Sequence, residues 1–378
     1  MMQSPPLRTE SPIEWRRAAP HRAPGDVGPT ADARRVLARF VAVPADRLPS
    51  RSVVRAALEA ALGADGLAAL AAGFADPAAL SRGRRRLAAA IPRGPRTRWP
   101  DVTELVQRGN TLDADVHDAF FNIFRGEDHD ALRHVLTIVD AALALRADLE
   151  ETETTLGDAA LARIGRGIED SFALATGVRP ATLALPPGRE GLTDDPDHAA
   201  RRWLRGHHVF LVITQGLVVA LDDLAATMRR EGGDPGTQAR ALAAFAALID
   251  LSSDTMSLTG DFAAHIYDGV IRVAMAPPFM PEGFSGVFSS DHRHLVRRLR
   301  EERPMFEALR HGLPGAHADA VASMIRLYDN HKQVCSRFIG VDQGSLLMNA
   351  ASDETAVDQL EKFKRSRLRS LGVAPPKT

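Results

Sequence analysis

The sequence contains a single cysteine, Cys335, which follows His331 by four positions within a pattern typical of a helix. At a rise of about 1.5 Å per residue, two such side chains lie about 6 Å apart on one face. An imidazole that binds the iron of a porphyrin, with a thiol beside the edge of the ring, needs roughly this separation. Covalent attachment of haem is therefore geometrically possible. The competing interpretation is a packed core thiol near a hydrogen-bonded histidine, because free cysteine is commonly buried.

The overall composition favours an all-α fold. Aromatic residues make up only 5% of the 378 residues. Alanine, leucine and arginine dominate, which favours helices over strands. The 47 Lys and Arg against 48 Asp and Glu give a net charge of -1, so the bulk charge does not indicate a nucleic-acid partner.

The cysteine count and the apolar segments indicate the cellular compartment. One cysteine excludes an internal disulfide and fits a reducing cytoplasm, where we expect the protein to act. Residues 1–30 are rich in proline and arginine without an apolar stretch, so we interpret them as a disordered tail rather than a signal peptide or anchor. No uninterrupted run of about 18 apolar residues follows, and no membrane association is expected.

Helical patterns organise the rest of the chain. We expect a helical N-terminal region over 31–190, a haem-binding core over 191–352, and a charged, peripheral C-terminal helix and tail over 353–378. Asp76 and Pro77 are typical of a helix start, and Gly177 of a helix end. Apolar spacing predicts short helices over 31–74 and longer ones over 128–155, 158–176, 199–231, 237–275, 314–339 and 353–371. In the helix over 237–275, Gly260 and Gly269 are candidate positions for a bend.

Several segments of the second half, taken in chain order, resemble the tryptophan 2,3-dioxygenase superfamily of haem proteins. The resemblance covers roughly residues 200–350 and implies the helical haem-binding fold of that superfamily. Its segments are RGHHVFLVITQ over 205–215, TMSL over 255–258, IRVAMAP over 271–277, GFS over 283–285, and a pattern of His, Arg, Ile-Gly and Gly-Ser over 331–345.

This resemblance implies roles for three residues. His331 would bind the haem iron, Arg272 the carboxylate of an aromatic amino acid, and Ser345 would lie beside the ammonium group of that substrate. An arginine binds a carboxylate through two parallel N–H donors, which supports the assignment of Arg272. The superfamily has a His-Gln pair where this chain has Thr214 and Gln215. We therefore expect insertion of oxygen rather than cleavage of an indole ring.

A second histidine extends the pattern around the cysteine. His292 precedes His331 by 39 positions (331 minus 292), and Cys335 completes the order His, spacer, His-x-x-x-Cys. This order is similar to that of the haem-dependent 3-methyl-L-tyrosine hydroxylases of saframycin-type antibiotic pathways. That resemblance implies a haem with two histidine ligands, His292 and His331, and one thioether bond to Cys335. His294 is the alternative to His292, and either could instead be a partly exposed helix residue.

The expected function is that of a haem-dependent monooxygenase. The resemblance implies that it hydroxylates 3-methyl-L-tyrosine beside the ring hydroxyl, with hydrogen peroxide as the oxidant. Thr214 is a candidate hydrogen-bond donor to bound peroxide, and His292 has to leave the iron before an oxidant binds. Phe279, Phe284 and Tyr267 are candidate walls of the substrate site.

Other interpretations stay open. A dioxygenase acting on tryptophan is the alternative among enzymes. A haem-binding electron carrier or sensor is the alternative of another class, because two histidine ligands are the usual arrangement there. His207 and His208 are candidate pocket residues, although a structural role is favoured for both. The resemblance to the superfamily also makes a homo-oligomer the expected assembly.

Overall fold

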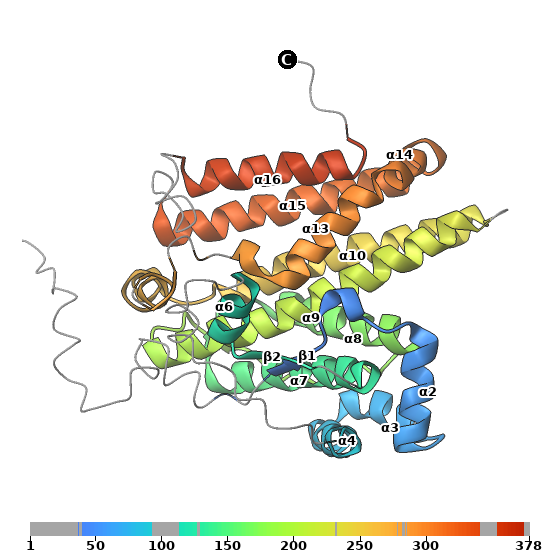
Figure 1. The fold of residues 1–378 in the computed structure, drawn as a ribbon. Helices are drawn as coiled ribbons and strands as arrows, with labels where there is room; N and C mark the ends of the chain where they lie inside the picture. Colours follow the sequence, from blue (N-terminus) through green and yellow to red (C-terminus); the bar gives the residue numbers. More distant parts are fainter. Residues whose placement is uncertain are drawn as a thin grey trace, which may run out of the picture.

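The computed structural model confirms the predicted all-α fold. In Figure 1 the long helices form layers, with α15 (Pro314–Ile339) and α16 (Ala356–Ser370) above α9 (Pro196–Arg229) and α10 (Pro235–Thr259), and with α7 (Asp130–Glu151) and α8 (Asp158–Thr176) below. One hydrophobic core runs through all of these layers. The division of the chain near residue 190 stays a prediction. The structure describes residues 37, 40–92, 113–126, 129–230, 233–277, 279–281, 284, 286–340 and 354–373.

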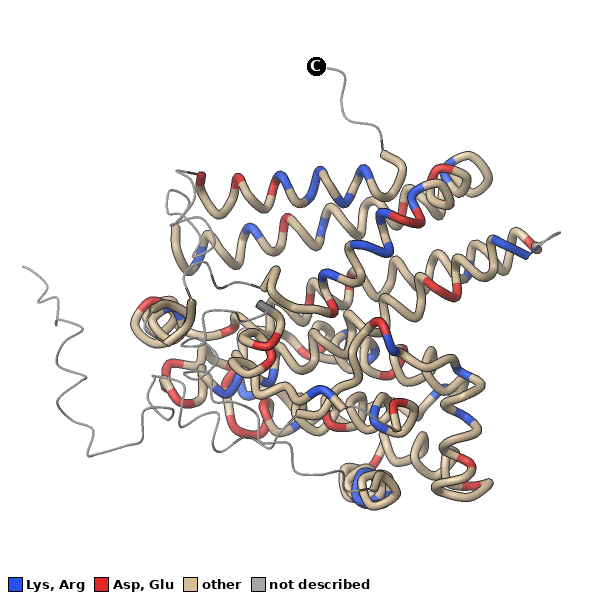
Figure 2. The backbone as a smooth tube through the Cα atoms, viewed as in Figure 1, with Lys and Arg blue, Asp and Glu red and all other residues tan. Residues whose placement is uncertain are grey.

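Shorter elements connect and flank the long helices. The further helices are α2 (Arg51–Leu62), α3 (Gly66–Ala72), α4 (Pro77–Ala90), α6 (Asp113–Phe120), α11 (Ala264–Ile266), α12 (Arg272–Ala274), α13 (Ser290–Glu301) and α14 (Arg303–Gly312). Single 3-10 or π-helical turns are η3 (Ala45–Arg47), η4 (Gly73–Ala75), η5 (Tyr267–Ile271) and η6 (Gly286–Phe288). Acidic and basic residues are interspersed over the helices, as Figure 2 shows.

Local sequence signals set the ends of several helices as predicted. The Asp76 carboxylate accepts a hydrogen bond from the backbone N–H of Ala78 at 2.9 Å, and Pro77 begins α4. Helix α8 ends at Gly177, whose φ of 73° is left-handed and whose N–H donates to the carbonyl of Ala173. These caps depend on neighbours in the sequence, which is why they can be predicted.

Helices α9 and α10 approach each other closely. A Cβ on Gly206 would lie 2.3 Å from Oγ1 and 2.8 Å from Cα of Thr259, so the approach requires glycine. By length and composition alone both helices are apolar enough to cross a membrane, which a search for uninterrupted apolar runs does not detect. In this fold 72% of the apolar window of α9 and 50% of that of α10 are buried inside the protein. Their apolar faces therefore contribute to the core.

The helix predicted over 237–275 is interrupted at 260–263. Helix α10 ends at Thr259, beside the candidate bend at Gly260, and α11, η5 and α12 continue helically over 264–274. The buried carboxylate of Asp261 explains the break. It accepts hydrogen bonds from Oγ1 of Thr154 at 2.6 Å and from the backbone N–H of Thr155 at 2.8 Å. A continuous helix would carry this carboxylate away from its donors, and burying it without them is unfavourable.

Two pairs of short parallel strands were not predicted. Strand β1 (Phe40–Ala42) pairs with β2 (Ile123–Arg125), and β3 (Glu153–Thr154) pairs with β4 (Arg189–Glu190). The prediction of helix over 31–74 is therefore wrong at β1, although α2 and α3 lie within it. A strand of three residues is too short for the two-residue period to be distinguished from helical spacing.

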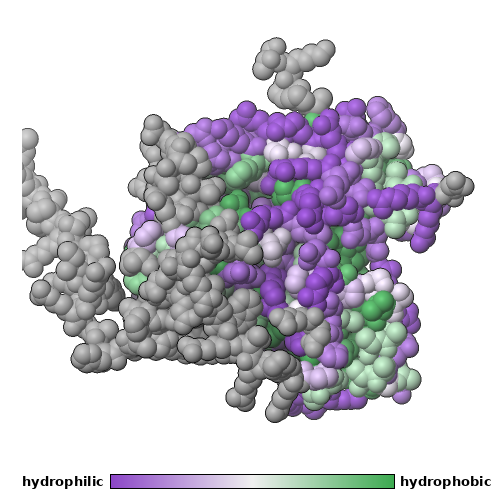
Figure 3. Space-filling view, viewed as in Figure 1, coloured by the Kyte–Doolittle hydropathy of each residue, from purple (hydrophilic) through white to green (hydrophobic). Residues whose placement is uncertain are grey.

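The charge of the C-terminal helix α16 predicts a peripheral position, and this prediction is wrong. It packs on α15, and Ala356, Leu360 and Phe363 line an internal cavity. The surface over α16 and α13 is mainly hydrophilic in Figure 3. Helix α16 thus places one face against the interior and a charged face towards solvent.

Candidate active site

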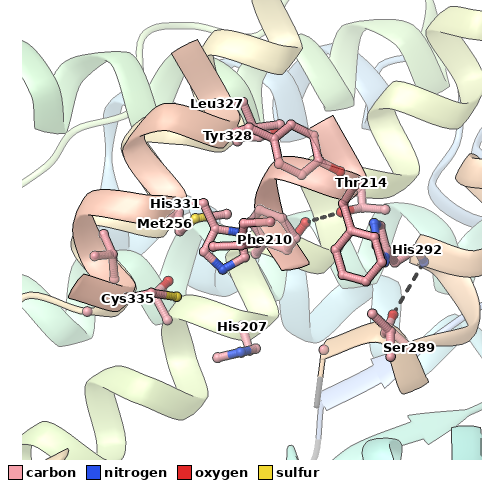
Figure 4. A pocket seen from close by; sticks show the side chains of 18 of the residues that line it. His207, Phe210, Thr214, Met256, Ser289, His292, Leu327, Tyr328, His331 and Cys335 are labelled. Atoms are coloured by element: carbon pink, nitrogen blue, oxygen red, sulfur yellow. Dashed lines mark hydrogen bonds between the residues drawn. The ribbon is translucent and has the colours of Figure 1, made fainter. Parts of the chain in front are cut away.

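A cavity of about 360 Å³ lies among α9, α10, α13, α15 and α16 and is seen from close by in Figure 4. Most of its lining is apolar, and its polar members include the residues that the sequence singles out. These are His207, Thr214, Tyr267, Arg272, His292, His331 and Cys335, to which the structure adds His117, Tyr328 and Arg367.

Helix α15 presents His331 and Cys335 to the cavity from successive turns. Burial lowers the pKa of His331 to about 4 and raises the pKa of Cys335 to about 11, because apolar surroundings disfavour each charged form. Near pH 7 the imidazole is therefore neutral and keeps a lone pair for a metal ion, and the thiol is protonated. The two side chains share a face, as their spacing predicts.

Helix α13 brings His292 to the same cavity. Ser289 caps this helix by accepting a hydrogen bond from the backbone N–H of His292 at 3.3 Å. Burial, with smaller effects of Arg367 and His331, lowers the pKa of His292 to about 4. His294 is not among the cavity residues, and its Nδ1 lies 2.8 Å from a guanidinium nitrogen of the same helix. The structure therefore brings His292, and not His294, together with His331.

These donors fit a haem group. Among the residues that the structure describes, neither the His292 ring nor the His331 ring has a hydrogen-bond partner. A porphyrin supplies four nitrogens to iron and leaves two axial positions, which suit two neutral imidazoles. A thiol near the ring edge suits a thioether bond. Within the described ranges, no group of three or more His, Cys, Asp or Glu side chains could hold a metal ion by itself.

A buried polar cluster holds the first turn of α13. Asp291 is 1% exposed and accepts hydrogen bonds from Nη2 of Arg125 at 2.5 Å and from Nε2 of Gln215 at 2.9 Å. Arg125 also donates to both carboxylate oxygens of Asp118, at 2.6 and 2.9 Å. Asp291 thus anchors the helix and does not cap it. The role of Arg125 has no sequence signal, because its partner Asp291 lies 166 positions further along the chain.

Thr214 lies on the cavity wall, and its hydroxyl hydrogen is already engaged. Its Oγ1 donates to the carbonyl of Phe210 at 2.8 Å, one turn earlier in α9 (Figure 4). In this conformation the hydroxyl can accept a hydrogen bond from a molecule in the cavity, and it has to rotate before it can donate one.

Tyr267, Phe338 and Arg272 form another part of the wall. The rings of Tyr267 and Phe338 stack with centroids 4.4 Å apart. Burial raises the pKa of Tyr267, and the positive charge of Arg272 acts on it in the opposite direction. Arg272 is half-buried. The predicted carboxylate-binding residue is thus at the cavity, beside an aromatic pair.

The remaining predicted substrate residues differ in their outcome. Phe284 is 1% exposed, lines the cavity and packs against Phe120 with ring centroids 5.0 Å apart. Phe279 is not among the residues that line this cavity, so its predicted place in the wall is wrong. Ser345 lies outside the described residues.

The two consecutive histidines of α9 have different surroundings. His207 lines the cavity, and its Nδ1 lies 2.6 Å from the carbonyl of Trp203. His208 faces away, with Nε2 2.7 Å from the carbonyl of Phe121 and its ring stacked on Phe40 at 4.2 Å. Burial lowers the pKa of His207 to about 3 and that of His208 to about 4, so both rings are neutral at pH 7. His208 has the structural role.

Taken together, the fold and the cavity define a helical protein with a largely apolar cavity that two neutral histidines and a thiol line. The chain belongs to the SfmD 3-methyl-L-tyrosine peroxygenase family, whose model matches residues 41–317. That match contains His292 and ends before His331 and Cys335. The further link to the tryptophan 2,3-dioxygenase superfamily stays a prediction.

Two known proteins illustrate the relationship. The 3-methyl-L-tyrosine peroxygenase of Streptomyces lavendulae is 35% identical over 250 residues, which are 63% of this chain and 66% of that protein, just under two thirds of its length. The crystal structure of reduced SfmD, soaked with sodium hydrosulfite, matches with a TM-score of 0.59 and 27% identity, over 80% of this chain and 99% of that chain.

Proposed function

We propose that this protein is a haem-dependent peroxygenase that converts 3-methyl-L-tyrosine to 3-hydroxy-5-methyl-L-tyrosine in antibiotic biosynthesis in the cytoplasm. The observation that carries this proposal is the meeting of His292, His331 and Cys335 on one apolar cavity. The name of the relative from Streptomyces lavendulae, a 3-methyl-L-tyrosine peroxygenase, supports the substrate and the use of peroxide.

Three residues of the chain would hold the haem. His331 and His292 supply neutral imidazole nitrogens to the iron, and Cys335 supplies the thioether sulfur. The thioether would form by addition of the Cys335 S–H across a haem vinyl group, with sulfur on one carbon and hydrogen on the other, and would consume no oxidant. Because His292 lies on α13 and the other two residues lie on α15, loss of the His292 ligand would leave the bonds from His331 and Cys335 in place.

Other residues of the chain would bind and orient the amino acid. Arg272 holds the substrate carboxylate through two N–H donors, and Ser345 receives the ammonium group. Phe284 and Tyr267 are the aromatic walls for the substrate ring. After rotation away from the Phe210 carbonyl, the Thr214 hydroxyl donates a hydrogen bond to peroxide, although it is too weak a base to accept a proton near pH 7.

The net reaction sets what the cavity has to do. The haem, when bound, supplies the oxidising chemistry. One peroxide oxygen is inserted into the ring C–H bond beside the hydroxyl group, which gives a catechol, and the other oxygen leaves as water. The apolar lining excludes bulk water, which favours oxidation of the substrate over loss of peroxide.

Two measurements on purified full-length protein test the proposal. The first is the mass of the denatured chain beside its visible spectrum, with Cys335→Ala as the matched control. We expect a gain of one haem mass on the peptide that contains Cys335, and no gain in the variant. The second is turnover of 3-methyl-L-tyrosine, which we expect with hydrogen peroxide alone.

Each other outcome points elsewhere. An unmodified mass with a haem spectrum would remove the thioether from the proposal. Turnover of tryptophan with oxygen alone would indicate a dioxygenase. A haem spectrum that no aromatic amino acid perturbs would indicate an electron carrier or sensor. A purified chain that binds no haem would overturn the proposal as a whole.

A further inference from the structure

Helix α16 carries one basic residue that turns away from solvent. The acidic residues of this helix lie towards its start and the basic residues towards its end, which complements the helix dipole (Figure 2). The side chain of Arg365 is 61% exposed, whereas Arg367 is only 7% exposed and lines the cavity with His292 and His331. A guanidinium is thus directed to the cavity in which the haem and substrate are proposed to bind.

Arg367 differs from the other buried arginines of the described chain. Nε of Arg202 lies 2.9 Å from Asp148, and Nη1 of Arg205 lies 2.8 Å from Glu151. Among the described residues no carboxylate lies within ion-pair distance of Arg367. Removing a guanidinium from water is unfavourable unless an anion pairs with it. An anion that binds in the cavity would therefore stabilise the buried Arg367 side chain.

Tyr328 is the side chain that accompanies Arg367. It is 8% exposed and lies on α15, three positions before His331, where it faces the same cavity (Figure 4). Its hydroxyl is close enough to the Arg367 guanidinium for the two groups to affect each other's pKa. Burial raises the pKa of Tyr328 and lowers the pKa of Arg367, and the positive charge of Arg300 adds to the second shift. The pair offers hydrogen-bond donors and one positive charge, and holds no negative charge.

We propose that Arg367 and Tyr328 bind a carboxylate group inside the cavity. This inference rests on the proposed function, because both expected occupants carry carboxylates, namely the haem propionates and the α-carboxylate of the amino acid. A guanidinium binds a carboxylate through two parallel N–H donors, and a phenol O–H can add a third. Arg272 comes from a different element, α12, so the cavity has arginines for two separate carboxylates.

The experiment compares each ligand with an analogue that lacks the carboxylate charge. Haem is compared with haem dimethyl ester in the reversible Cys335→Ala background. In the protein with haem bound, 3-methyl-L-tyrosine is compared with 3-methyltyramine. Binding is followed by the haem absorption spectrum in Arg367→Gln, Arg367→Lys and Tyr328→Phe. We expect Arg367→Gln to weaken binding of one charged ligand about tenfold or more, while binding of its neutral analogue changes little. Arg367→Lys should retain part of the preference.

The arms distinguish the two sources of the carboxylate. If Arg367→Gln loses the preference for haem over haem dimethyl ester, the bound carboxylate is a haem propionate. If it loses the preference for 3-methyl-L-tyrosine over 3-methyltyramine, the bound carboxylate is that of the substrate. Arg365→Gln, on the exposed face of the same helix, is the matched control and should change neither preference. Tyr328→Phe keeps the aromatic ring and removes only the hydroxyl group, and it should weaken the same preference. It provides the test if Arg367→Gln does not fold. Retention of both preferences in Arg367→Gln and Tyr328→Phe would overturn this inference and leave the proposed function standing. A wild type that binds neither haem nor amino acid would overturn both.

Discussion

The side-chain amide of Gln215 on α9 donates a 2.9 Å hydrogen bond to the carboxylate of Asp291 on α13. Asp291 directly precedes His292 in the sequence. The same Nε2 atom donates to the carbonyl of Val43 at 2.7 Å, just after β1. The start of α13 is therefore tied to two distant parts of the chain. Because His292 is the next residue, its position in the cavity depends on this buried cluster.

Asp291→Asn should destabilise the fold by about 2–3 kcal/mol, because the buried Arg125 loses one of its two charged partners. Urea unfolding at pH 7 measures this free energy. Asp222→Asn is the control, since Asp222 also pairs with an arginine but its side chain is 53% exposed. We expect a change of about 1 kcal/mol or less there. Equal losses in the two variants would contradict the role of the cluster.

The two histidine variants should differ in their haem content. His331→Ala should lose most of the haem, because it removes the ligand next to the thioether. His292→Ala should keep the haem through His331 and Cys335, while its visible spectrum changes because one axial ligand is lost. Haem per chain and the spectrum of each purified variant check this. Loss of haem from His292→Ala alone would reverse the assignment.

Arg272→Gln should weaken binding of 3-methyl-L-tyrosine about tenfold or more, because a charged hydrogen-bond pair is lost. Binding of 3-methyltyramine, which has no carboxylate, should change little. Arg297→Gln, whose side chain is 62% exposed on α13, is the control and should resemble the wild type. Unchanged binding of the amino acid in Arg272→Gln would remove this residue from the substrate site.

His208 should make the fold sensitive to acid. Its pKa is about 4 in the folded chain, against an ordinary value of 6.5. Between these values the unfolded chain binds a proton that the folded chain does not, so stability falls as the pH drops from about 6.5 to 4, by up to ~1.4 kcal/mol per pH unit. Above pH 6.5 this contribution to the pH dependence vanishes. Unfolding free energies measured across this range should fall less steeply in His208→Gln, and His265→Gln, at an exposed site, should keep the wild-type slope.

Gly206→Ala should destabilise the fold by roughly 1–3 kcal/mol, because its Cβ would overlap the Thr259 backbone and side chain. Gly315→Ala is the control, and it should stabilise the fold slightly. Nothing lies within 4 Å of its added Cβ, and alanine is the better helix former. Thermal unfolding of both variants measures the difference. Similar midpoints would show that α9 and α10 can separate without loss.

Local chemistry explains which features of the site could be predicted. His331 and Cys335 share a face because the helical repeat alone brings positions four apart together, and α15 has the predicted bounds. The choice between His292 and His294 could not be made in the same way, because it depends on which face of α13 packs against the interior. Arg367 could not be recognised either, since a charge-rich helix predicts solvent exposure.

The sequence by itself determined the all-α fold, the bounds of most of the long helices, and the order of histidine, histidine and cysteine, because propensity, caps and helical periodicity act between near neighbours. Only the tertiary structure decided that the chain leaves the helix over 260–263 instead of bending there, since Asp261 takes its hydrogen bonds from residues about a hundred positions earlier. It also decided that α16 covers the cavity and that Arg367 faces inwards. These features depend on contacts between distant segments, and no local pattern encodes which segments meet.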